Sequence, residues 1–397
     1  MIYLHIFAKY NIINGSEVIA IRQLFTKLAD FFRESEKFLT ILCFCAGAYG
    51  CMAVYSATYY KESFRPVIVQ TFCLFAGIFA AIVISAIDYE KFFKFWFLVA
   101  AGGIIPVILT FFIGIAPEGT DDKAWLDLGF TTLQPSELMK ICFVITFALH
   151  LRKIKPNINK FKYLLPLVLH GVFPVGLIFY QGDYGTALVF ACITFFMMWA
   201  GGVSWKYFLL GFSSIAIASP FIYFFALGEH HRERITALFD IDADIKGVGY
   251  QQWRGRMALA NGGLTGQGFL KGDLTQAGIV PEGHNDFIFV SIGEELGFLG
   301  CAAVILLLAA ICLRCMRIAR ICTNDGGKYI CVGIFAMIFA QSLINLGMCT
   351  SILPVIGITL PFFSAGGTSM LCLFLGIGLV LSVFRNRNSR TLYLRDK

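Results

Sequence analysis

The chain has 397 residues, of which 58% are hydrophobic and 14% are charged. A soluble globular domain is about 45–50% apolar and about 25% charged, so the composition excludes an ordinary soluble domain and indicates a polytopic membrane protein. The formal net charge of +7 would suit a nucleic-acid partner. The basic residues lie between hydrophobic runs, however, where Lys and Arg set the orientation of membrane spans. We therefore expect no nucleic-acid partner.

The first hydrophobic run is preceded by an amphipathic stretch, residues 1–37. After Ser16, a candidate N-cap, apolar side chains follow helical spacing with basic residues between them. We expect a helix that lies on the cytoplasmic membrane surface or docks on the protein's own spans.

Long apolar runs dominate the rest of the chain, and a membrane span needs about 20 such residues. The sequence predicts an all-α membrane domain over 38–385, with one long extracytoplasmic loop at 229–285 and a basic cytoplasmic tail at 386–397. Ten spans are expected near 38–58, 67–87, 93–116, 135–151, 163–181, 185–203, 207–228, 286–312, 329–352 and 358–384.

The distribution of Lys and Arg predicts the orientation of these spans. With the N-terminus in the cytoplasm, the inner segments carry 22 of the 32 Lys and Arg residues, whereas the short outer loops carry 3. Both termini are therefore expected in the cytoplasm. The 13 cysteines lie mostly inside apolar runs, where they are expected to pack as small hydrophobic side chains.

Asp286 directly precedes the apolar run that opens the eighth span, in the stretch Pro-Glu-Gly-His-Asn-Asp-Phe. An ionisable residue at a membrane boundary is a functional candidate by default. The alternative is structural, because Asn285 or Asp286 could cap the helix that follows.

Glu137 and Lys140 form a second candidate, since a helix that starts near Pro135 places them three residues apart on one face. They could form a cationic site for an anionic head group, or a structural ion pair that joins two helices. Asp183 lies in the stretch Gln-Gly-Asp-Tyr-Gly, with a glycine on either side. It is either a turn residue or a third candidate for a functional residue.

The long loop contributes Arg232 and Arg234, residue types that suit a phosphate or pyrophosphate near a membrane surface. The alternative is that these arginines are solvated or face the lipid and have no binding role.

Farther along, residues 344–370 interrupt apolar sequence with Pro354, Pro361 and a Gly-Gly pair. Broken backbone at membrane depth is tolerated where it is buried in protein or lines a cavity, so we expect this segment beside Asp286.

Taken in order over about 38–385, these stretches resemble the SEDS family of shape, elongation, division and sporulation proteins, which includes RodA and FtsW. A few positions depart from the family pattern, such as Asn285 in place of Thr and Ala365 in place of Tyr, but none removes an acid or a base. Two glycine-containing runs favour a RodA-like over an FtsW-like member. The matching residues are Trp125 to Gly129, Gln134 to Glu137 with Lys140, Asp183 with Gly185 to Ala187, Gly249 to Gln251, Pro281 and Glu282 with His284 and Asp286, Glu294 to Gly297, and Leu353 to Gly367.

The resemblance implies a peptidoglycan glycosyltransferase in the bacterial cytoplasmic membrane. Such enzymes polymerise lipid II, a disaccharide-pentapeptide on undecaprenyl pyrophosphate, together with a class B penicillin-binding protein. It implies Asp286 as the catalytic residue and Glu137 with Lys140 in the central cavity. We add Asp183, Arg232, Arg234 and His284 as candidates for substrate binding, and a divalent cation such as Mg²⁺, with Asp286 as one ligand, as a compatible cofactor. A lipid II flippase and a non-enzymatic scaffold for the transpeptidase are the alternatives.

Overall fold

The computed structural model describes residues 36–116, 123–127, 129, 132–226, 228, 232–233, 236, 247 and 249–387. Residues 1–35 of the expected amphipathic segment at 1–37, most of the basic tail and Arg234 lie outside this part of the chain. The helices are α3 (Lys37–Thr58), α4 (Arg65–Ala86), α5 (Tyr89–Lys94), α6 (Trp96–Ile113), α7 (Pro135–Ile154), α8 (Phe161–Tyr180), α9 (Tyr184–Gly201), α10 (Trp205–Phe221), α12 (Tyr250–Gly262), α13 (Asp273–Gln276), α14 (Ile288–Ile321), α15 (Asp325–Cys349) and α16 (Gly367–Arg385).

Within the described residues, nine helices are long and apolar enough to cross a membrane, and this confirms an all-α polytopic membrane protein. α7 has similar length and lies among them, but it carries four charged residues. With α7, the helices account for the ten predicted spans. The described residues also include short turns of 3-10 or π-helix at Tyr59–Lys61, Lys155–Asn157 and Ile222–Ala226. They include one small antiparallel pair, β1 (Leu126–Asp127) with β2 (Thr132–Leu133), and an isolated bridge between Ile115 and Trp125.

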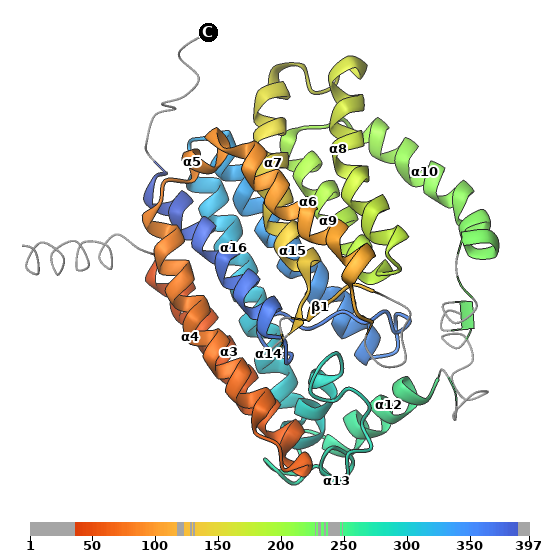
Figure 1. Cartoon of the computed structure of the whole chain (residues 1–397). Coiled ribbons are helices and arrows are strands. Elements are labelled where there is room, and N and C mark those ends of the chain that lie inside the picture. Colours follow the sequence, from red (N-terminus) through yellow and green to blue (C-terminus); the bar gives the residue numbers. More distant parts are fainter. Residues whose placement is uncertain are drawn as a thin grey trace, which may run out of the picture.

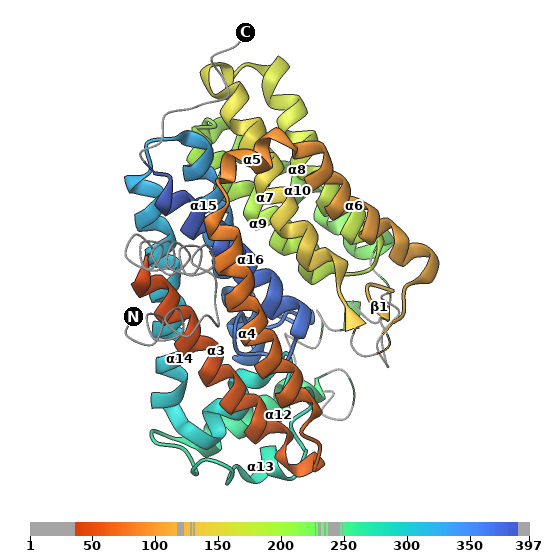
Figure 2. The ribbon, with the colours of Figure 1, turned by 60° about the vertical axis from the view of Figure 1, so that its left-hand side comes forward.

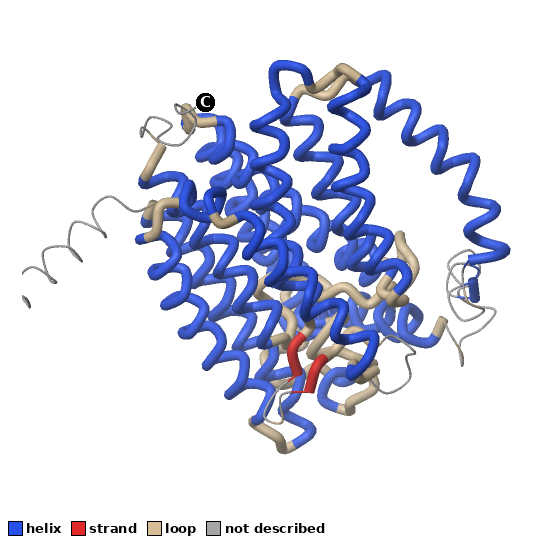
Figure 3. The backbone as a smooth tube through the Cα atoms, turned by 45° about the horizontal axis from the view of Figure 1, so that its top comes forward, coloured by secondary structure: helices blue, strands red, loops and turns tan. Residues whose placement is uncertain are grey.

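The helices form a bundle with α15 and α16 near its centre (Figure 1). In each of these two helices 72% of the most apolar stretch is buried, whereas only 6% is buried in the stretch that includes α10. α3 and α4 cover one side, and α10 stands away from the bundle on the other (Figure 3). The short helices α12 and α13 lie at the end of the bundle opposite α5 (Figure 2). We call these two ends the α12/α13 end and the α5 end.

Two predicted spans differ from the structure in a way that matters for function. The tenth helix begins at Gly367 instead of 358, because Pro354, Pro361 and several glycines prevent a helix before it. Residues 353–366 instead form an irregular segment, which we call the broken segment. The eighth span begins at Ile288 and runs farther than predicted, to Ile321.

α14 also bends at Gly297, whose φ of 66° is outside the helical range. The glycine-rich turn after α12 pairs with the freed backbone groups of this bend. The Gln267 amide donates to the Glu294 carbonyl at 3.0 Å, and the Phe298 amide donates to the Gly263 carbonyl at 2.9 Å. This backbone pairing fixes the first turns of α14, which follow Asp286 in the chain.

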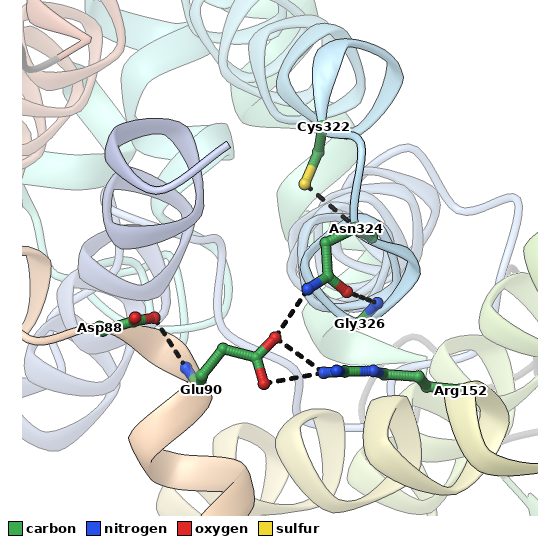
Figure 4. A network of polar contacts seen from close by, with 6 residues as sticks. All are labelled: Asp88, Glu90, Arg152, Cys322, Asn324 and Gly326. Carbon is green, nitrogen blue, oxygen red and sulfur yellow. Dashed lines mark hydrogen bonds and ion pairs between the residues drawn. The ribbon is translucent and has the colours of Figure 1, made fainter. Parts of the chain in front are cut away.

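At the α5 end, a buried polar network joins α5, α7 and α15 (Figure 4). Arg152 donates to both carboxylate oxygens of Glu90, at 2.7 and 2.8 Å. Asn324 caps α15 by accepting from the Gly326 amide, and its own amide donates to Glu90 at 2.7 Å. The side chains of Arg152 and Glu90 are 6% and 7% exposed. The network therefore fastens one end of α7 and α15, the helices whose opposite ends lie at the α12/α13 end.

Candidate active site

Asp286 lies in the turn that leads into α14, and it is half-buried. The N-cap position of α14 is Phe287, so neither Asn285 nor Asp286 occupies it, contrary to the structural alternative. The backbone of Asp286 is held from α15. Its carbonyl accepts a hydrogen bond from the Asn345 amide at 2.7 Å and one from the Cys349 thiol at 3.5 Å.

The broken segment lies directly against this turn, as predicted. The Ala365 amide donates to the His284 carbonyl at 2.9 Å, and the Ser364 hydroxyl donates to the Asn285 carbonyl at 2.8 Å. At Gly357, where φ is +69°, a Cβ would lie 3.6 Å from Oδ2 of Asp286. Three successive residues of the turn are thus contacted by one stretch of irregular backbone.

The broken segment also reaches the beginning of α9. A Cβ at Gly185 would lie 2.6 Å from the Ile356 carbonyl oxygen, so only glycine allows this approach. Asp183 caps α9 by accepting from the Thr186 amide at 2.9 Å, and it accepts a second bond from Gln134 at 3.1 Å. Asp183 therefore has a structural role, as its turn interpretation predicted, at a point next to the broken segment.

Burial raises the pKa of the Asp183 carboxyl above its ordinary value. The Thr186 hydrogen bonds and the nearby Lys140 ammonium act in the opposite direction, and Glu137 adds to the increase. Because Glu137 and Lys140 influence Asp183 electrostatically, the three charged groups form one cluster at the facing ends of α7 and α9.

Glu137 and Lys140 form an ion pair within α7, with 2.7 Å between Lys140 Nζ and Glu137 Oε1. The pair forms within one helix, at the spacing that the sequence predicted. Their side chains are 5% and 0% exposed. A pair this deeply buried costs desolvation energy and is weak evidence for a role in stability alone. The adjacent Ser136 hydroxyl is buried without a hydrogen-bond partner within the described part of the chain.

The remaining candidates lie in different places. His284 is in the Asp286 turn, and burial lowers the pKa of its imidazole; Lys61 lowers it further, whereas Glu282 acts in the opposite direction. Arg232 lies in the connection between α10 and α12, where its described hydrogen bonds use only its backbone. Among the described residues Arg232 makes no hydrogen bond to the Asp286 turn, and Arg234 lies outside these residues.

A metal centre built from protein side chains is not found in the described residues, which contain no group of three or more His, Cys, Asp or Glu residues arranged to hold an ion. Cys312 and Cys315 have C-x-x-C spacing, but both are buried free thiols inside α14.

The sequence-based predictions missed two side-chain amides that organise the site. Asn345 bonds to both the Asp286 turn and the broken segment. Gln70 of α4 donates to the Ser364 carbonyl at 2.9 Å and accepts from the Gly366 amide at 3.1 Å. The available signal was an amide side chain inside an apolar run, a residue type that joins membrane helices through hydrogen bonds.

Comparisons with known proteins agree with this arrangement. A model of the FtsW/RodA/SpoVE cell cycle proteins matches residues 36–389. The peptidoglycan glycosyltransferase MrdB of Escherichia coli strain K12 is 32% identical over 67% of this chain and 71% of its own length. The probable peptidoglycan glycosyltransferase FtsW of Geobacter metallireducens is 28% identical over 88% of this chain and 96% of its own length.

A solved structure gives the same result at the level of the fold. It is described as "Structural coordination of polymerization and crosslinking by a peptidoglycan synthase complex", and one of its chains superposes with a TM-score of 0.78. That chain is 26% identical, and the match covers 90% of this chain and 99% of the other. This chain therefore belongs to the FtsW/RodA/SpoVE family, and it is a multi-pass peptidoglycan glycosyltransferase of the bacterial cytoplasmic membrane that serves cell shape or division.

Proposed function

We propose that the chain polymerises lipid II into glycan strands and that Asp286 is its catalytic residue. In this reaction a sugar hydroxyl of the acceptor attacks the anomeric carbon of the donor. A new glycosidic C–O bond forms, the bond from that carbon to the undecaprenyl pyrophosphate breaks, and the hydroxyl proton passes to the Asp286 carboxylate. A general base must reach the attacking hydroxyl within hydrogen-bond distance or through one water.

The observation that carries this proposal is the way the Asp286 turn is held. Asn345 fixes the backbone carbonyl of Asp286, and the broken segment bonds to the carbonyls of the two preceding residues, His284 and Asn285. These contacts act on the backbone, the residue is half-buried, and Oδ2 of its carboxylate lies beside Gly357 of the broken segment. A reactive group placed on a fixed backbone at a membrane boundary suits substrates whose lipid tails stay in the bilayer.

The buried cluster on α7 and α9 supports a role in binding the anionic part of the substrate. Lys140 supplies the cation, and Glu137 positions it through the 2.7 Å ion pair. We infer supporting roles for Asp183 and His284, which flank the broken segment, and for Arg232 and Arg234 in the long loop. Asp286 could instead hold a divalent cation such as Mg²⁺, which would neutralise negative charge on the leaving pyrophosphate, and this is an alternative role for the carboxylate.

We also infer the orientation and the partner. The bias of basic residues puts both termini in the cytoplasm and the α12/α13 end outside, with 38–385 as the membrane domain and 229–285 as an outer loop. A relative occurs in a complex that couples polymerisation to crosslinking, which supports a class B penicillin-binding protein as the partner of this chain. Its glycine-containing runs favour a RodA-like member.

The flippase alternative is less well supported. A transport path should have polar groups available along both halves of the membrane. At the α5 end, however, Glu90, Arg152 and Asn324 are bound to one another in a buried network, and Lys155 pairs with Asp325 at 2.6 Å. These groups hold helices together, whereas the cluster of Glu137, Lys140 and Asp183 lies at the beginnings of α7 and α9.

The test is polymerisation of purified lipid II by the full-length protein, with and without its transpeptidase partner and Mg²⁺. We expect glycan chains from the wild type and none from a folded Asp286→Asn variant. Dependence on Mg²⁺ would favour the ligand role over the base role. Full activity of Asp286→Asn would contradict both roles, and absence of polymer from the wild type with a bound partner would favour transport or scaffolding.

A further inference from the structure

Asn345 connects three parts of the molecule that are separate in sequence. Its side-chain amide donates at 2.7 Å to the carbonyl of Asp286 and at 2.7 Å to the carbonyl of Ile358 in the broken segment. Its side-chain oxygen lies 3.7 Å from the Cys349 thiol, one turn later on α15. One rigid side chain on a central helix therefore joins the turn before α14 to the broken segment.

The environment makes these bonds hard to replace. Asn345 is 0% exposed, so water cannot take over either bond easily if the amide is removed. Loss of a hydrogen-bond partner is costly for a buried polar group. Here the Ile358 carbonyl would lose the Asn345 donor, and the Asp286 carbonyl would keep only the Cys349 thiol, which is a weak donor. The Asp286 turn would be expected to shift until its carbonyl found a stronger donor than the Cys349 thiol.

Two other amides also bond to the broken segment, but they act away from Asp286. Gln252 of α12 donates to the Leu353 carbonyl at 2.8 Å, and Gln70 of α4 bonds to Ser364 and Gly366. Both are buried, at 2% and 1% exposure. Of these three amides, only Asn345 bonds to Asp286. A Gln252→Ala variant is therefore a matched control, because it removes a buried amide that bonds to Leu353 instead of Asp286.

We propose that Asn345 is a positioning residue, which holds the Asp286 carboxylate against the acceptor hydroxyl by fixing the backbone of Asp286 relative to the broken segment. This inference rests on the proposed function, because it assigns Asn345 a task in the same reaction. A displacement of about 1 Å in a reacting group can cost about 100-fold in rate. The effect should fall on the chemical step, since Asn345 is buried beneath the turn and does not itself face the substrate.

The experiment compares three variants of the full-length protein in complex with its partner: Asn345→Ala, Asn345→Asp and Gln252→Ala. Steady-state lipid II polymerisation gives kcat and KM, and thermal unfolding gives the folded fraction. In Asn345→Asp the new side chain has nearly the same volume as asparagine. Its carboxylate cannot donate a hydrogen bond to the two carbonyl oxygens that Asn345 contacts. A packing role predicts near-normal activity for this variant, whereas a hydrogen-bonding role predicts a loss.

We expect both Asn345 variants to lose about 30- to 100-fold in kcat per folded molecule, with little change in KM, and Gln252→Ala to stay within about 3-fold of wild type. For Asn345→Asp, activity relative to wild type should rise as the pH falls, because protonation restores one donor. Equal effects of the Asn345 and Gln252 variants would overturn the proposal.

Failure of both Asn345 variants to fold would assign this residue to the fold and would also overturn the proposal. The wild type serves as the separate test of the proposed function. If it makes no polymer, lipid II polymerisation itself is contradicted. If it is active and the Asn345 variants match Gln252→Ala, only the positioning role is lost.

Discussion

Glu90 and Asp286 are carboxylates near opposite ends of α15, and the protein surrounds them in different ways. Both oxygens of Glu90 accept bonds from Arg152, and Asn324 at the start of α15 adds a third donor. Near the other end of α15, Asn345 bonds to the backbone of Asp286. The first set of contacts neutralises a carboxylate, and the second fixes the position of one whose side chain stays half-buried.

The comparison separates two uses of polar groups in a membrane protein. A buried charge that is fully paired joins helices, and its loss should change stability. A carboxylate that is fixed through its backbone beside irregular chain is suited to meet a substrate, and its loss should change activity. The Glu137–Lys140 pair shares features of both, since it is buried like Glu90 but lies near the broken segment.

The largest expected effect concerns the Glu137–Lys140 pair. It is measured by comparing Lys140→Met with the double variant Glu137→Gln/Lys140→Met. Lys140→Met leaves the Glu137 carboxylate buried without its ion-pair partner, which should cost about 3–5 kcal/mol of stability. The double variant should recover most of that loss, because neither member of the pair is then charged. Thermal unfolding and lipid II polymerisation measure the two properties separately. Recovery of both stability and activity would assign the pair to structure alone.

Arg152→Met tests the α5 end. It should destabilise the protein by about 3 kcal/mol, because the Glu90 carboxylate keeps the Asn324 donor but loses its cation. Activity per folded molecule should remain close to wild type when polymerisation is normalised to the folded fraction. A large fall in kcat without loss of stability would show that the two ends are coupled.

Gly357→Ala should have a smaller effect on the site. Alanine at a φ of +69° is strained by about 1–2 kcal/mol, and its methyl group would lie 3.6 Å from Oδ2 of Asp286. Gly202→Ala at the end of α9 is the matched control, because its φ is +90° and a Cβ there would contact nothing within 4 Å. Polymerisation should fall several-fold more for Gly357→Ala, and equal losses would mean that backbone strain alone is responsible.

The smallest effect concerns His284. Lys61 is the second cause, after burial, of the lowered pKa of its imidazole, so Lys61→Gln should raise that pKa. Glu282→Gln should lower it further, because Glu282 acts in the opposite direction. Since a lowered histidine pKa favours the folded state at high pH, the stability from this site should decline as the pH falls below about 6.5. NMR titration of labelled histidine measures both shifts, and unchanged values would remove Lys61 and Glu282 from the surroundings of His284.

The sequence predicted the spans well because hydropathy depends on local composition. It also predicted that residues 344–370 would lie beside Asp286, since proline and glycine break a helix where only a buried or cavity-lining backbone is tolerated. The predicted start of the tenth span was wrong for the same reason. Residues 358–366 are mostly apolar, but Pro361 and its neighbours keep them out of a helix.

The contacts that organise the two ends could not be predicted in this way. Asn345 bonds to a carbonyl 59 residues earlier in the chain, and Arg152 pairs with a carboxylate 62 residues earlier. Such partners are set by helix packing and leave no periodic pattern in a single sequence. Sequence alone therefore identified Asp286 as a candidate but missed the amide that holds it.

The most direct test measures Asp286→Asn and Glu90→Gln side by side, with thermal unfolding and lipid II polymerisation recorded on the same samples. We predict that Asp286→Asn unfolds like the wild type but loses at least about 100-fold in polymerisation, the contribution typical of a general base. Glu90→Gln should unfold at a lower temperature and keep near-normal activity per folded molecule. An active Asp286→Asn variant, or an inactive but stable Glu90→Gln variant, would contradict the account.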